Sequence, residues 1–260
     1  MRTLGIDLAS QAPKTAACAI DWRDGRGTVA ILRVGLDDDQ LLAMARESKV
    51  VGIDAPFGWP TSFVAMMARH HSPSHPTALA IPPWFPELRD SLRFRRTDYV
   101  VRESLGRWPL SVSSDLIAIV AMRCAGLLDR LEVRDRGGAG PVSRDHPLPH
   151  QVVEVYPAVA LSAWGLAHRR YKGSDATSRA VLGGLVKSVR DLCPNLSLSR
   201  ESADLCSASD HAFAALVGAL VARAAFLGLT TPPPEADATI ARDEGWIAIP
   251  HRGSLRLLVT

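Results

Sequence analysis

Four acidic residues lie at the edges of strongly apolar stretches, where they could bind a metal ion. These acids are Asp7, Asp54, Glu154 and Asp210. Burying an ionised carboxylate is costly unless it is paired, hydrogen-bonded or bound to a metal. Carboxylate oxygens are hard ligands that suit Mg²⁺ or Mn²⁺. The four acids together therefore predict a metal centre, with Mg²⁺ or Mn²⁺ as its cofactor.

Such a centre is typical of phosphodiester hydrolysis. Two divalent ions ~3.5–4 Å apart can activate a water and stabilise the leaving oxygen. We therefore interpret the four acids as both catalytic residues and metal ligands of a divalent-metal-dependent nuclease. Its substrate phosphates would contact a group of arginines in the middle of the chain, namely Arg93, Arg95, Arg96 and Arg102. The expected partner is nucleic acid.

Each acid also has a purely structural interpretation. The two strand-end aspartates could cap turns. Glu154 could pair with an arginine such as Arg95 or Arg96. Asp210 follows Ser207 by three residues, which is the spacing of a helix capping box. The joint pattern favours the metal site, because the order of elements brings the first two acids together.

The elements before residue 55 predict how those two acids meet. Apolar or alternating runs predict strands at residues 2–8, 15–22, 27–34 and 50–54, and a helix at 37–48. The turn Asp24-Gly25-Arg26-Gly27 is typical of a hairpin. A helix that returns the chain to the sheet favours a parallel strand pair. We expect the strand at 50–54 to lie beside the first, with Asp7 and Asp54 at neighbouring carboxyl ends.

Later elements are less regular. Helices are predicted at residues 113–131, 175–192 and 207–227, strands at 151–156 and 246–249, and a connector at 194–204. Residues 61–110 are rich in Pro, His and Arg and predict an irregular insertion. We expect the whole chain, residues 1–260, to form one domain of the α/β class.

Several of these segments together resemble a known family. They are Gly5-Ile6-Asp7, Val51-Gly52-Ile53-Asp54-Ala55-Pro56-Phe57-Gly58-Trp59-Pro60, Arg96-Thr97-Asp98, Glu154-Val155-Tyr156-Pro157, Ser209-Asp210-His211-Ala212-Phe213-Ala214-Ala215 and Glu244-Gly245-Trp246-Ile247-Ala248-Ile249-Pro250. The chain resembles the DUF429 family of predicted nucleases with an RNase H-like fold. The Ile-Asp-Ala-Pro and Glu-Val-Tyr-Pro segments are the most specific.

The resemblance implies a five-stranded mixed sheet flanked by helices, with acidic residues at its centre. It implies that Asp7 and Asp54 are the central metal ligands and that Glu154 is a further one. Asp210, at the start of a late helix, would match the final acid of RNase H-like nucleases and Holliday-junction resolvases. Asp98 is another candidate. The Pro/His/Arg-rich middle of the chain, residues 72–107, is a departure from a minimal nuclease core.

Composition limits the alternatives. The net charge of +3 is too small to indicate nucleic-acid binding by itself. No run of about 18 apolar residues predicts a membrane span. The four cysteines lack C-x-x-C spacing, which argues against a thiolate zinc site. We expect a cytoplasmic protein without membrane association.

Two other functions remain open on the sequence. The strand-Asp-turn at Asp7-Leu8-Ala9-Ser10 also resembles the start of sugar-kinase and actin-like phosphotransferases, although no second Gly-rich phosphate loop follows a strand. Saturable nucleotide binding would favour that function. A non-catalytic binding protein that keeps the fold is the third possibility, and failure to bind Mg²⁺ or Mn²⁺ would favour it.

Overall fold

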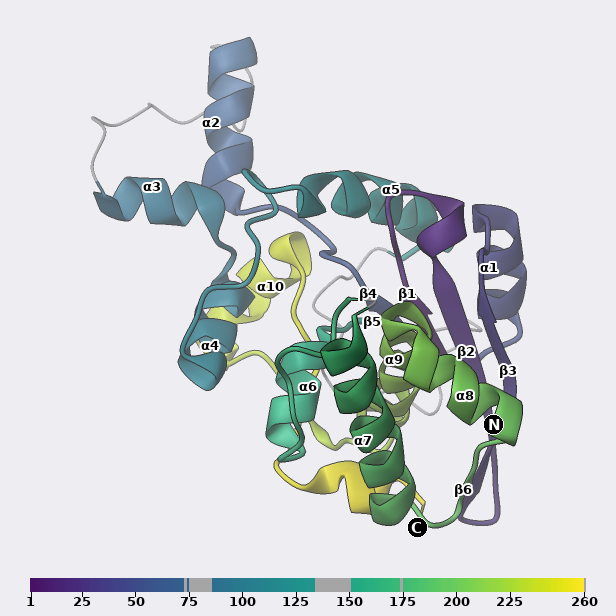
Figure 1. Cartoon of the computed structure of the whole chain (residues 1–260). Coiled ribbons are helices and arrows are strands. Elements are labelled where there is room, and N and C mark those ends of the chain that lie inside the picture. The colour runs from purple at the N-terminus through teal and green to yellow at the C-terminus, as the bar shows by residue number, and fades with distance from the viewer. Residues whose placement is uncertain (73, 75–85, 134–150, 174, 260) are drawn as a thin grey trace.

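The computed structural model describes residues 1–72, 74, 86–133, 151–173 and 175–259, and Figure 1 shows their arrangement. Within these residues the chain forms an α/β fold around a six-stranded mixed sheet of order β5-β4-β1-β2-β3-β6. Its strands are β1 (Arg2–Asp7), β2 (Ala16–Arg23), β3 (Arg26–Val34), β4 (Val50–Asp54), β5 (Gln151–Glu154) and β6 (Leu196–Ser197).

The first three strands form an antiparallel meander, and β4 then pairs in parallel with β1. The crossover between β3 and β4 is α1 (Asp38–Arg46), which begins with a capping box between Asp37 and Gln40. The predicted parallel pair is therefore confirmed. The strand count is one higher than expected, because two residues of the predicted connector pair with the edge strand β3 as β6.

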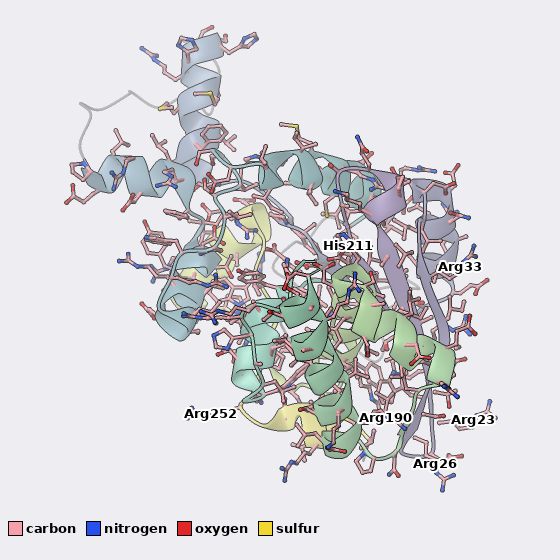
Figure 2. All side chains as sticks on the ribbon, viewed as in Figure 1. Arg23, Arg26, Arg33, Arg190, His211 and Arg252 are labelled. Atoms are coloured by element: carbon pink, nitrogen blue, oxygen red, sulfur yellow. The ribbon has the colours of Figure 1, made fainter. Side chains whose placement is uncertain are left out.

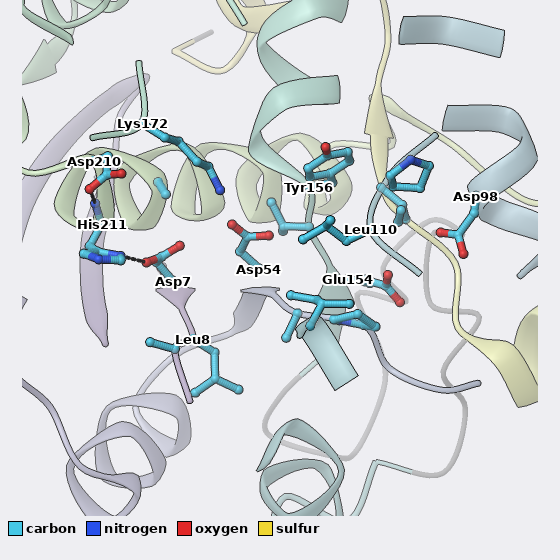
Figure 3. A pocket seen from close by; sticks show the side chains of 18 of the residues that line it. Asp7, Leu8, Asp54, Asp98, Leu110, Glu154, Tyr156, Lys172, Asp210 and His211 are labelled. Atoms are coloured by element: carbon cyan, nitrogen blue, oxygen red, sulfur yellow. Dashed lines mark hydrogen bonds and ion pairs between the residues drawn. The ribbon is translucent and has the colours of Figure 1, made fainter. Parts of the chain in front are cut away.

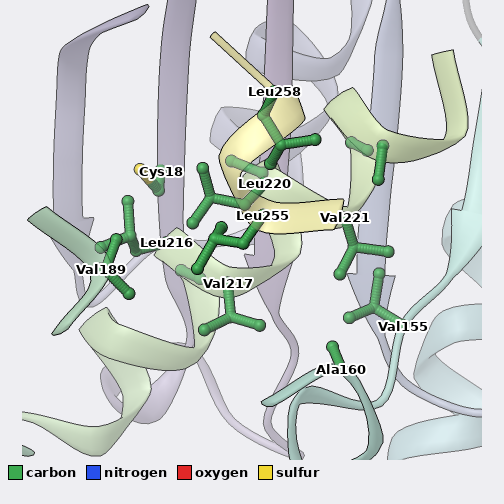
Figure 4. Close-up of a cluster of buried hydrophobic side chains, with 14 of the residues drawn as sticks. Cys18, Val155, Ala160, Val189, Leu216, Val217, Leu220, Val221, Leu255 and Leu258 are labelled. Carbon is green, nitrogen blue, oxygen red and sulfur yellow. The ribbon is translucent and has the colours of Figure 1, made fainter. Parts of the chain in front are cut away.

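Helices cover both faces of the sheet. On one face, α1 and α5 (Ile117–Arg130) pack on apolar side chains such as Leu4 and Ile53. On the other face lies the larger core around α9 (Asp210–Phe226), shown in Figure 4. Around α9 are α6 (Pro157–Ala163), α7 (Ala176–Leu192), α8 (Arg200–Ala208) and the small sheet of β7 (Thr230–Thr231) and β8 (Ile249–Pro250).

Glycines let α9 lie unusually close to the two central strands. A Cβ built on Gly5 would overlap the backbone of α9 at Ala215 and Ala219. A Cβ on Gly52 would lie 2.6 Å from the carbonyl oxygen of Gly218. The helix therefore contacts the strand backbones directly, and its N-terminus is fixed beside the carboxyl ends of β1 and β4.

The predicted helix at 207–227 is two helices in the structure. Ser209 accepts a hydrogen bond from the amide of Ala212 and caps α9, so Asp210 is the first helical residue and Ser207 belongs to α8. Among the described helices none alone has the length and apolar composition to span a membrane; α8 and α9 together meet that test on those two criteria, with a bend of 116° between them. Residues 212–225 of α9 are all buried in the core.

The expected irregular insertion at 61–110 is largely helical where the structure describes it. It contains α2 (Thr61–His71), α3 (Pro86–Arg93) and α4 (Arg96–Leu105), while residues 73 and 75–85 lie outside the described part. Near the C-terminus, α10 (Ala238–Glu244) packs against α2 and α4. The carboxylate of Glu244 joins these helices by accepting from the amides of Thr61 and Arg96.

Candidate functional site

Asp7 and Asp54 are register partners at the ends of two central parallel strands. Neighbouring strands lie about 4.8 Å apart, so the two carboxylates share one small space. Both side chains leave the sheet on the face covered by α9, because each is two residues beyond a glycine that contacts this helix. Beyond the helix N-terminus this face is open, and Figure 3 shows the two carboxylates side by side.

Burial and the charged neighbours of Asp54 together shift the pKa of its carboxyl. Burial raises the pKa of the Asp54 carboxyl well above its usual range, Lys172 opposes the rise, and the neighbouring carboxyl of Asp7 adds to it. Burial alone would lower the pKa of Lys172, but the negative charges of Asp54 and Asp7 more than offset this and raise it. The side chain of Lys172 extends toward Asp54 in Figure 3. Asp54 therefore takes up a proton readily and needs positive charge nearby to stay ionised.

His211 forms a hydrogen bond with the carboxylate of Asp7. Its Nδ1 lies 2.6 Å from Oδ2 of Asp7. Because a carboxylate can only accept, Nδ1 carries the hydrogen. This bond raises the pKa of His211, although burial acts against the rise. The second oxygen of Asp7 is turned toward Asp54 (Figure 3).

Asp210 reaches the same region but has other partners. Its Oδ2 accepts from the amide of Gly173 at 3.2 Å, and its Oδ1 accepts from the amide of His211. The Gly173 bond fixes the loop that carries Lys172. On its other side the carbonyl of Lys172 accepts from the hydroxyl of Ser178. Asp210 thus positions the lysine beside the two carboxylates.

Glu154 belongs to a different, buried ionic cluster. Its two oxygens accept from the guanidinium of Arg95 at 2.8 and 2.9 Å, and one also accepts from the amide of Phe57. The same guanidinium donates to both oxygens of Asp98, and its last bond goes to the carbonyl of Glu244. The side chains of Arg95, Asp98 and Glu154 are at most 3% exposed. This cluster ties α4 to the end of β5.

The pleat of the sheet explains why Glu154 differs from Asp54. Glu154 is the register partner of Ile53, so it leaves the sheet on the opposite face from Asp54. Among the described residues no group of three or more His, Cys, Asp or Glu side chains is arranged to bind a metal ion. The expected cluster of four carboxylates is therefore wrong. What the structure brings together is a pair, Asp7 and Asp54, with Asp210 beside it.

The arginines expected to bind phosphate are also largely engaged. Arg95 is buried with five guanidinium hydrogen bonds, so its expected phosphate contact is wrong. Arg96 pairs with Asp237. Arg93 contacts the Phe94 ring and Ser114, and Arg102 lies over the ring of Trp108.

A pocket of about 270 Å³ opens at the ends of β1, β4 and β5. The charged residues Asp7, Asp54, Lys172, Asp210 and His211 line one part of it. Much of the rest is apolar and includes Leu8, Pro109, Leu110, Ile117 and Ile247. The arrangement can bind a small anion or metal complex at one end and an apolar group at the other.

The sequence interpretation missed Lys172 and His211. Lys172 is one of only four lysines in an arginine-rich chain, and it lies between two predicted elements. His211 follows Asp210 directly at a helix start, where a basic ring can reach the acid of a neighbouring strand. The rarity of lysine and this Asp-His pair are signals that could have identified both residues.

The fold and the pocket define a mixed α/β protein with paired carboxylates at the ends of two central parallel strands. The chain belongs to the DUF429 family, because the family model described as "Protein of unknown function (DUF429)" matches residues 5–239. This match confirms the family that the sequence motifs indicated. No curated protein and no solved structure matches the chain.

Proposed function

We propose that this protein is a divalent-metal-dependent hydrolase of phosphoesters, with the ion held by Asp7 and Asp54. The observation that carries the proposal is their register pairing at the rim of a pocket. The sheet order supports it as well. Asp7 and Asp54 lie at the ends of β1 and β4, and Asp210 begins α9, the helix that packs on these strands. This is the arrangement expected of RNase H-like nucleases.

The residues present fit Mg²⁺ or Mn²⁺. Magnesium commonly uses only one or two protein carboxylates and completes its shell with water and substrate phosphate. The two aspartates supply hard oxygen donors, and the raised pKa of Asp54 indicates that its ionised form lacks sufficient positive charge. A dication would supply that charge and would act as a Lewis acid toward a phosphoryl oxygen.

The chain's own residues have separate tasks in this proposal. His211 holds one oxygen of Asp7 and leaves the other directed toward Asp54. Lys172 provides a positive charge for a substrate phosphate. In hydrolysis the oxygen of water bonds to phosphorus, the bond to the leaving oxygen breaks, and that oxygen takes up a proton. Asp210 keeps Lys172 in place through Gly173.

A Mn²⁺ titration tests the proposal directly. Isothermal titration calorimetry of the wild type should show saturable binding, and Asp54→Asn should abolish it. Asp204→Asn is the matched control, because Asp204 is an exposed carboxylate on α8 outside the pocket. In parallel, hydrolysis of bis(p-nitrophenyl) phosphate should require Mn²⁺ and stop on addition of EDTA.

The outcomes separate the candidate functions. Mn²⁺ binding with metal-dependent hydrolysis supports the proposal. Saturable nucleotide binding with phosphate transfer to an alcohol would favour a phosphotransferase instead. A wild type that binds no Mn²⁺, or an Asp54→Asn variant that binds it unchanged, would overturn the metal site.

A further inference from the structure

Most of the basic side chains that line the pocket are already paired with acidic residues. Among the described residues that line it, the basic ones are Arg95, Lys172 and His211. The guanidinium of Arg95 is fully used by Glu154, Asp98 and a carbonyl. The ring of His211 is held by Asp7. Lys172 is the remaining cation, and its charged neighbours include Asp54 and Asp7.

Two hydrogen bonds hold the loop that carries Lys172. The amide of Gly173 is held by Asp210, and the carbonyl of Lys172 is held by Ser178. The backbone of Gly173 has a φ of +124°, a region that favours glycine. One fixed ammonium group beside two carboxylates is suited to one phosphate at a time.

The remainder of the pocket is suited to an apolar group. Leu8 lies beside Asp7, and Leu110 lies beside Tyr156, as Figure 3 shows. Leu110 is 61% exposed, so an apolar surface stays in water until a ligand covers it. The volume of about 270 Å³ lies just below the usual range of small-molecule sites, about 300–1,000 Å³.

Among the described residues, the pocket has no continuous row of basic side chains that could bind a long polyanion. Proteins that follow a nucleic-acid backbone use several Lys and Arg contacts in a row. Arg93, Arg96 and Arg102 do not line the pocket. The exposed Arg23 and Arg26 belong to the β2–β3 hairpin, at the end of the sheet opposite His211 (Figure 2).

We infer that the substrate is a small phosphoester that carries one phosphate and one apolar or aromatic group. This inference rests on the proposed function and defines its substrate class. The phosphate faces Lys172 and the two aspartates, and the organic group lies on the apolar part of the pocket that includes Leu110. Duplex or long single-stranded nucleic acid is not the preferred ligand.

Binding of phenyl phosphate and of inorganic phosphate, measured by calorimetry with and without Mn²⁺, tests the inference. Burial of the ring predicts that phenyl phosphate binds about ten- to a hundredfold more tightly. Leu110→Ser should reduce this preference roughly fivefold. The control is Leu116→Ser, because Leu116 is 85% exposed and does not line the pocket.

A second variant tests the phosphate end. Lys172→Met should weaken both ligands equally, by about tenfold, while Mn²⁺ binding stays the same or becomes tighter. Equal binding of the two ligands by the wild type would overturn the inference. A single-stranded oligonucleotide that binds more tightly than phenyl phosphate, with a steep dependence on salt, would also overturn it. Failure of Mn²⁺ binding alone contradicts the proposed function instead, because the comparison of ligands can be made without metal.

Discussion

Replacement of Arg95 by methionine should destabilise the protein severely and in a pH-dependent way. Methionine keeps the length of the side chain but removes all five guanidinium hydrogen bonds. It leaves the carboxylates of Glu154 and Asp98 buried without their cation. Removing one partner of a buried ion pair typically destabilises by about 3–5 kcal/mol, so we expect a loss at or above the upper end of that range.

The pH dependence follows from Glu154. Burial already raises the pKa of Glu154 although Arg95 opposes the rise, so removal of Arg95 raises that pKa further. A carboxyl whose folded pKa lies above its unfolded value is most favourable to folding below the unfolded pKa. This stability is lost as the pH rises through the folded pKa. The penalty of Arg95→Met should therefore be smaller near pH 5 than near pH 8.

Urea unfolding followed by circular dichroism at both pH values measures this penalty. Arg96→Met is the matched control, since Arg96 is a half-exposed neighbour paired with Asp237 and should lose only about 0–1 kcal/mol. If the free energy of unfolding of Arg95→Met lies within about 1 kcal/mol of the wild type, or if its loss is the same at both pH values, the cluster does not stabilise the fold.

Three further predictions concern the strands and the pocket. Gly5→Ala should destabilise by about 1–3 kcal/mol or more, because the new methyl overlaps α9; Gly126→Ala, on the open side of α5, should be neutral or stabilising in the same urea assay. Asp54→Asn should raise the melting temperature near pH 8 more than near pH 4, since the raised pKa of Asp54 makes its ionised form unfavourable to folding; an equal change at both pH values would contradict this. The imidazole of His211 should titrate by NMR above its ordinary pKa of 6.5 and return toward it in Asp7→Asn. The His211 contribution to stability should be present at low pH and lost as the pH rises through the folded pKa, and an unshifted titration would show that the hydrogen bond is absent in solution.

The first half of the sheet could be predicted because its signals are local. The hairpin turn predicts the antiparallel meander. The capped helix α1 and the apolar run of β4 predict a strand that returns parallel to β1, which places Asp7 beside Asp54. The bounds of these elements differ from the predicted ones by one or two residues at most ends. β6 was not predicted, because a strand of two residues is too short to show a periodicity in the sequence.

The candidate site was harder to predict because it depends on tertiary contacts. Whether Glu154 binds a metal or an arginine depends on which face of β5 it occupies, and that is set by pairing with β4. The apolar neighbours Val153 and Val155 face the α9 core, which places Glu154 on the opposite face from Asp54. The position of Lys172 depends on a bond between Gly173 and Asp210, which are 37 residues apart.

The ionic cluster around Arg95 also affects how the protein folds during its synthesis. The cluster joins Arg95 to Glu154, 59 residues further on, and to the carbonyl of Glu244, 149 residues further on. The helix that covers the central strands, α9, also comes late in the chain. Contacts between such distant segments slow folding. A nascent chain that stops before α9 would expose one face of its sheet, and one that stops before Glu244 would have an incomplete ionic cluster. We therefore expect the nascent chain to need protection by chaperones until these segments leave the ribosome.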